Sequence, residues 1–82
     1  METDIYYLGG WKNLHTLMSS PPDRENAVFE IWLENEQLAE VSKEPGRSLD
    51  IQIYSRPGGD AWDVDLLELM SVLEKAAKNL DG

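Results

Sequence analysis

The alternation of side chains over residues 27–34 restricts the fold of this chain more than any other feature. Apolar side chains occupy every second position of this segment: Ala27, Phe29, Ile31 and Leu33. Successive side chains of a β-strand point to opposite faces, so the pattern predicts a strand with one face on an apolar core. The intervening side chains, among them Glu30, Trp32 and Glu34, then share the opposite face.

Two further strands are predicted after this one, at Leu38–Ser42 and at Ser48–Ser55. A turn at Asn35–Gln37 precedes the first, and the Pro45–Gly46 interruption precedes the second. In the later strand, alternation again separates an inward from an outward set. The inward set is apolar: Leu49, Ile51 and Ile53.

The length of the Asn35–Gln37 turn decides how the first two strands pair. A three-residue turn sets Ile31 opposite Val41 and Leu33 opposite Ala39, which keeps the apolar side chains on one face. A two-residue turn would set Glu40 opposite Ile31, because a one-residue slip exchanges the faces of a strand. We therefore expect the three-residue register.

The C-terminal residues carry the pattern of an amphipathic helix. Asp63 is the expected N-cap, and acidic side chains near the start with lysines near the end complement the helix dipole. Apolar side chains then recur every three or four residues: Leu66, Leu69, Met70, Leu73, Ala76, Ala77 and Leu80. We expect this stripe to cover the inner face of the sheet.

The first 20 residues fit more than one structure. Trp11, Leu14, Leu17 and Met18 would share one face of a short helix. Residues 5–8 would form an edge strand or an extended arm, and a hairpin through Gly9–Gly10 competes with both. The predicted fold is a single α+β domain over residues 1–82. It has an N-terminal arm and short helix, a three-stranded antiparallel meander, and a long C-terminal amphipathic helix on one face of the sheet.

Of the features of the composition, the net charge indicates most about the kind of partner that the chain binds. The 82 residues include 16 Asp and Glu against 7 Lys and Arg, for a net charge of −9. Nucleic acids and anionic lipids are bound mainly through Lys and Arg, so this chain favours a basic protein partner over nucleic acid or membrane. The chain has no cysteine, no apolar run long enough for a membrane span and no secretory signal pattern. We expect a soluble, cytoplasmic protein.

Catalytic and metal-binding constellations are not found in the sequence. His15 is the only histidine and cysteine is absent, which disfavours a zinc site and a Ser–His–Asp triad alike. Acidic pairs are abundant, but with sixteen acids they arise by chance, and a domain this small has little room for a desolvated cleft. We expect neither an enzyme nor a cofactor.

The outward face of the sheet is the predicted binding surface. Trp and Tyr are enriched in interface hot spots, and carboxylates around them would steer a basic partner. The alternative is that an N-terminal arm bearing Tyr6, Tyr7 and Trp11 covers this face as a second small core. The predicted partner-binding residues are Glu30, Trp32, Glu34, Glu40, Asp50, Gln52 and Tyr54.

In size, acidity and lack of a catalytic constellation, the chain resembles small proteins that neutralise basic enzymes. Bacterial immunity proteins, antitoxins and phage-encoded inhibitors of nucleases share these gross properties, which carry no residue correspondence. The resemblance implies an acidic protein-binding module that blocks the nucleic-acid site of a partner by mimicking phosphates. The alternatives are an adaptor or homodimer that pairs through a sheet edge, and a carboxylate-based, metal-dependent hydrolase.

Overall fold

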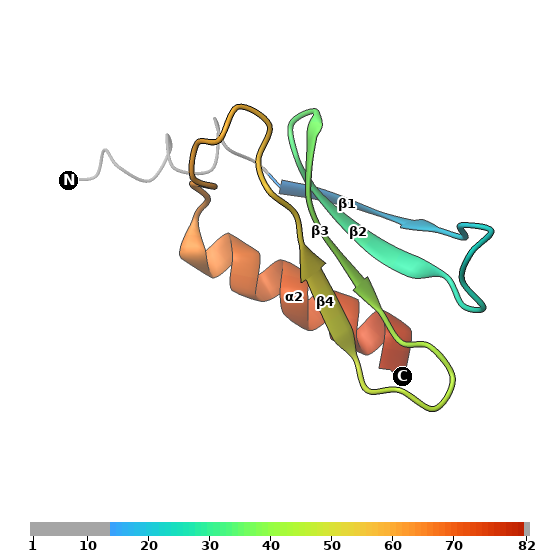
Figure 1. Cartoon of the computed structure of the whole chain (residues 1–82). Helices are drawn as coiled ribbons and strands as arrows, with labels where there is room; N and C mark the ends of the chain where they lie inside the picture. Colours follow the sequence, from blue (N-terminus) through green and yellow to red (C-terminus); the bar gives the residue numbers. More distant parts are fainter. Residues whose placement is uncertain (1–13, 82) are drawn as a thin grey trace.

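A computed structural model describes residues 14–81 and shows an antiparallel sheet with a helix on one face (Figure 1). The four strands lie side by side in the order β1-β2-β3-β4, so each is followed in the chain by its neighbour in the sheet. The elements are β1 Leu14–Ser19, β2 Val28–Leu33, β3 Glu36–Ser42, β4 Asp50–Ile53 and α2 Leu66–Asp81. The α+β class and the C-terminal helix packed on the sheet are thus confirmed, whereas the sheet has one strand more than predicted.

The additional strand, β1, replaces the short helix expected around Leu14, Leu17 and Met18. It pairs with β2 from Leu14 opposite Leu33 to Ser19 opposite Val28. The helix prediction was wrong because Leu14 and Met18 share a face in either structure, at i and i+4 of a helix or two pleats apart in a strand. Pairing also satisfies the backbone groups along one side of β2, which would otherwise form a sheet edge. Trp11, the arm and the Gly9–Gly10 hairpin lie outside the described residues.

The turn between β2 and β3 is tighter than predicted. Leu33 pairs with Glu36, which leaves a two-residue turn at Glu34–Asn35, and Glu34 adopts a positive φ of 55°. The register then shifts between Ile31 and Trp32, so that Ile31 pairs with Ala39 instead of Val41. At Ile31 the observed pairing differs from the prediction by two residues, which keeps Ile31, Ala39 and Val41 on their predicted face, whereas Leu33 pairs with Glu36 instead of Ala39. The shift is a β-bulge, and it inserts one extra residue into β3.

The core lies between the inner face of the sheet and α2. Ile31 is fully buried, as is Ala76 of the helix. The other buried apolar side chains of this cluster are Leu14, Phe29, Leu33, Leu38, Ala39 and Val41. The inward-facing set predicted from the β2 alternation is confirmed for Phe29, Ile31 and Leu33.

The helix does not cover the whole sheet. It packs on β1, β2 and β3. The three apolar side chains predicted to point inward from the last strand remain 37%, 42% and 67% exposed: Leu49, Ile51 and Ile53. Their burial was predicted wrongly because alternation fixes the face of a side chain but not the position of the helix over that face.

The helix begins two residues later than predicted, with Asp65 as its N-cap. An oxygen of the Asp65 carboxylate accepts a hydrogen bond from the Glu68 backbone N–H at 2.8 Å, and the Asp65 carbonyl accepts from Leu69 N–H at 3.0 Å. Glu68 Oε2 in turn accepts from the Leu14 backbone N–H at 3.1 Å. The first turn of α2 is thereby tied to the start of β1. Asp63 lies before the cap.

Candidate functional site

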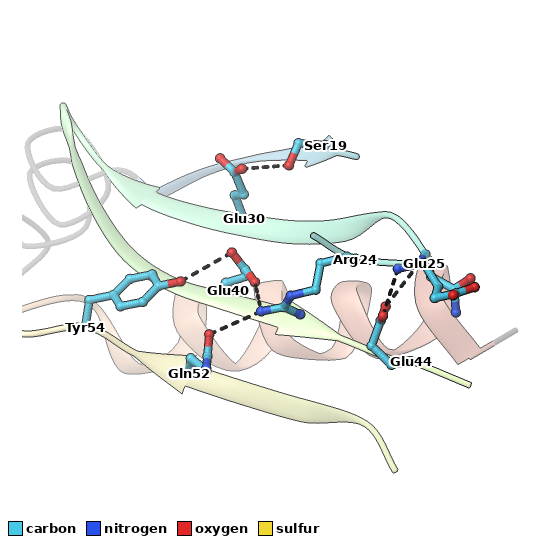
Figure 2. Close-up of polar contacts among 9 residues, drawn as sticks. Ser19, Arg24, Glu25, Glu30, Glu40, Glu44, Gln52 and Tyr54 are labelled. Atoms are coloured by element: carbon cyan, nitrogen blue, oxygen red, sulfur yellow. Dashed lines mark hydrogen bonds and ion pairs between the residues drawn. The ribbon is translucent and has the colours of Figure 1, made fainter. Parts of the chain in front are cut away.

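The face of the sheet opposite α2 gathers polar and aromatic side chains from all four strands and from the β1–β2 loop (Figure 2). We call this surface the outer face. Glu30 and Glu40 lie directly opposite each other on β2 and β3, and Glu40 lies opposite Gln52 of β4. Like charges placed opposite each other across strands are destabilising, so each carboxylate needs its own donors.

Glu30 is held by two donors. One oxygen accepts a hydrogen bond from Ser19 Oγ at 2.7 Å, and the other accepts from Trp32 Nε1 at 2.9 Å. His15, which pairs with Trp32 across β1 and β2, stacks on the indole with ring centroids 6.4 Å apart and planes 11° apart. The half-buried Trp32 is therefore fixed at both its edge and one of its faces.

Glu40 is held by a residue that the sequence analysis missed. Arg24 reaches across the outer face from the β1–β2 loop, and its Nη2 lies 2.6 Å from Glu40 Oε2 and 3.4 Å from Gln52 Oε1 (Figure 2). The hydroxyl of Tyr54 donates to the other Glu40 oxygen at 3.3 Å. Both oxygens of Glu40 are thus engaged within the protein. No pattern in the sequence indicates this pairing, because Arg24 lies in a loop far along the chain from β3.

The loop that carries Arg24 is itself anchored. Glu44 accepts hydrogen bonds from the backbone N–H groups of Glu25 at 2.9 Å and Asn26 at 3.1 Å, and Asn26 Nδ2 donates to the Lys43 carbonyl at 2.6 Å. These backbone hydrogen bonds, chiefly that from Glu25, lower the pKa of Glu44 below its ordinary value. The charged carboxylate therefore fixes the loop, and with it the position of Arg24.

The predicted binding residues divide into two groups. Glu30, Trp32 and Glu40 are half-buried and form the hydrogen-bonded interior of the outer face. Asp50, Gln52 and Tyr54 are more exposed, at and just beyond β4. Glu34 is exposed in the turn at the end of the sheet, so it does not belong to the strand face that alternation assigned to it.

An open hollow of about 630 Å³ adjoins the outer face between the β1–β2 and β3–β4 loops. Four carboxylates and two arginines line it, together with uncharged residues. Its charged residues are Asp23, Arg24, Glu25, Glu44, Arg47 and Asp50. The acidic excess suits this hollow to a Lys or Arg side chain rather than to an anion.

The pKa of Tyr54 gives a direct check of the outer-face network. Desolvation, followed by the nearby carboxylate of Glu40, raises this pKa above the ordinary value of 10.0. The neutral phenol is thus favoured by folding, so its contribution to stability is full below pH 10.0 and is lost as pH rises through the folded pKa.

The titration of Tyr54 is isolated by subtracting the absorbance titration of Tyr54→Phe from that of the wild type. We expect the Tyr54 tyrosinate to form at a higher pH than in an unfolded peptide. E40Q should lower the midpoint while leaving part of the shift, because desolvation remains. A Tyr54 midpoint unchanged by E40Q would show that the two groups do not meet in solution.

Among residues 14–81, no three His, Asp or Glu side chains converge on a position that would hold a metal ion. The helix described here is not long and apolar enough to cross a membrane. Comparisons with protein-family models, with curated proteins and with solved structures find no match for this chain.

Proposed function

We propose that the protein binds a basic partner protein through the outer face and acts as an inhibitor, occupying the positively charged site of a nuclease or another nucleic-acid-binding enzyme. The observation that carries this proposal is the network that holds Trp32 and Tyr54 among carboxylates on the face opposite the helix. The net charge of −9 would attract such a partner and repel nucleic acid itself.

The network supports binding by preorganisation. Side chains that are already ordered lose less conformational freedom when a partner arrives, and interface side chains otherwise cost about 0.5–1.5 kcal/mol each to immobilise. Trp32 is ordered by Glu30 and His15, and Tyr54 by Glu40. In this account Glu30 and Glu40 position the two aromatic anchors.

The Lys and Arg side chains of the partner would then contact the carboxylates that remain accessible outside the network. Asp50 lies on β4 at the rim of the acidic hollow, and Glu34 lies at the β2–β3 turn. Both are exposed. The charge field of these groups governs the rate and salt dependence of association more than its final affinity. The absence of cysteine is compatible with a reducing cytosol, where we expect this function to operate.

Affinity capture at two salt concentrations tests the proposal. The tagged protein is incubated with nuclease-treated lysate, first at low salt and then at about 1 M salt, where charges are screened beyond about 3 Å. We expect a basic protein to be captured at low salt and released at high salt, and its nucleic-acid activity to fall when the purified protein is added back. Capture of a partner that is retained at high salt, with undiminished activity, would contradict charge-driven inhibition.

A further inference from the structure

The edge of the sheet formed by β4 has backbone groups available for pairing. Tyr54 N–H donates to the Leu38 carbonyl at 2.9 Å, so the backbone groups of Tyr54, and by alternation those of Gln52, point toward β3. The N–H and C=O groups of Ile51 and Ile53 then point away from the sheet. Such an edge is a template for another strand.

Apolar side chains adjoin the same edge on the inner face. Between β4 and α2 lies a groove of about 230 Å³ whose lining is almost wholly apolar. It is lined in part by Ile51, Ile53, Trp62, Leu69 and Leu73. The groove is open because α2 packs over β1, β2 and β3.

The flank of α2 extends this apolar surface. On a helical wheel Leu66 and Met70 lie next to Leu73, which lines the groove, and away from Val72 on the other flank. Leu66 is 66% exposed and Met70 is 55% exposed. The apolar stripe predicted for the helix is therefore wider than the face that the helix buries. Its exposed members, Leu66 and Met70, lie on the flank of α2 next to the groove.

We propose that a second copy of this chain occupies the edge, with the two β4 strands pairing antiparallel about a two-fold axis. Antiparallel pairing of identical segments gives the closed, self-complementary contact of a C2 dimer. When Ile51 lies opposite Ile53 of the second copy, the two-fold axis also places Ile53 opposite Ile51 of the second copy, so the contact contains two such pairs. Residues opposite each other share a face, so the second α2 lies on the same side of the sheet and the two apolar grooves meet along the paired β4 strands.

Charge favours this edge as the place where two acidic chains meet. The whole chain has a net charge of −9, but residues 44–56 contain two arginines against two acids, a sum of zero. In the proposed register Asp50 faces Tyr54 of the second copy, so no two carboxylates are opposed. The outer face stays open on both copies. The dimer proposal is therefore independent of the proposed inhibitor function, and a test of one does not decide the other.

The mass of the protein in solution, measured by sedimentation over a range of concentrations, tests the dimer. We expect wild-type protein to reach twice the monomer mass and I53K to remain monomeric, with dimerisation at least about tenfold weaker. Ile53 is 67% exposed, so a lysine there is compatible with folding of the monomer, which circular dichroism checks. L17K, a matched change on β1 at the opposite edge, should dimerise as the wild type does.

Two outcomes would overturn the dimer. One is a wild-type protein that stays monomeric at every concentration, which would leave the groove to another occupant such as residues 1–13 of the same chain. The other is an I53K protein that dimerises as strongly as wild type, which would place the contact elsewhere. Loss of the dimer in L17K with its retention in I53K would assign the contact to β1.

Discussion

Ile31→Ala is expected to lower the free energy of unfolding by about 2–5 kcal/mol, the cost of removing a large aliphatic side chain from a core. Ile31 has no exposed surface and lies at the centre of β2, between β1 and β3 and beneath the helix. Domains are stable by only about 5–15 kcal/mol, and a chain of 82 residues belongs toward the lower end. This one change therefore removes a large share of the total stability.

Urea denaturation measures the effect as a shift of the transition midpoint. Leu17→Ala is the matched control, because Leu17 is a large aliphatic residue of the same sheet that is 45% exposed. We expect it to cost less than about 1 kcal/mol. Equal midpoints for the two variants would contradict the placement of the core between β2 and α2.

Trp32→Ala is expected to weaken binding of the captured partner by about five- to thirtyfold, corresponding to a loss of about 1–2 kcal/mol at the interface. The indole is the largest side chain on the outer face, and its orientation is set by Glu30 and by stacking on His15. A partner that contacts this face would lose its main apolar contact.

The Trp32 experiment needs a measure of folding beside the measure of affinity. Titration calorimetry with the purified partner gives the affinity, and urea denaturation gives the folded fraction. Leu67→Ala, a truncation of a 73% exposed apolar side chain on α2, should leave the affinity unchanged. If Trp32→Ala lost stability alone, with wild-type affinity in the folded fraction, Trp32 would be a support of the sheet and not a binding residue.

The parts of the fold that local patterns encode were predicted correctly. The period-two pattern of Phe29, Ile31 and Leu33 placed their side chains on the core, because the pleat assigns faces without reference to any other element. The apolar periodicity of the C-terminal segment likewise predicted a helix against the sheet. Leu14 and Met18 were assigned wrongly, because their spacing fits both a helix and a strand and only the free edge of β2 decides between them.

The parts that depend on distant contacts could not be predicted. The β-bulge beside Ile31 lies in the pairing of β2 with β3, after the tight Glu34–Asn35 turn, and alternation within one strand does not encode how that strand pairs. Arg24 reaches Glu40 across a loop whose path is set by the Glu44 carboxylate. The sequence therefore indicated the strand residues that share the outer face, but neither the place of Glu34 in the turn nor the engagement of two carboxylates by donors of the protein itself.

The most direct test of the central claim compares two variants that lose the same charge from different faces. E34Q/D50N removes two exposed carboxylates beside the outer face, and E74Q/D81N removes two exposed carboxylates from α2. Both change the net charge from −9 to −7, since each exchanges two acids for neutral residues. Their association rates with the purified partner are then measured against the wild type at low salt.

We expect E34Q/D50N to associate at least several-fold more slowly than E74Q/D81N, because steering depends on charges near the contact. E74Q/D81N should stay close to the wild type, and the difference between the variants should disappear at about 1 M salt. Equal slowing of both variants would mean that net charge alone attracts the partner, and greater slowing of E74Q/D81N would place the contact on α2. Either result would contradict binding through the outer face.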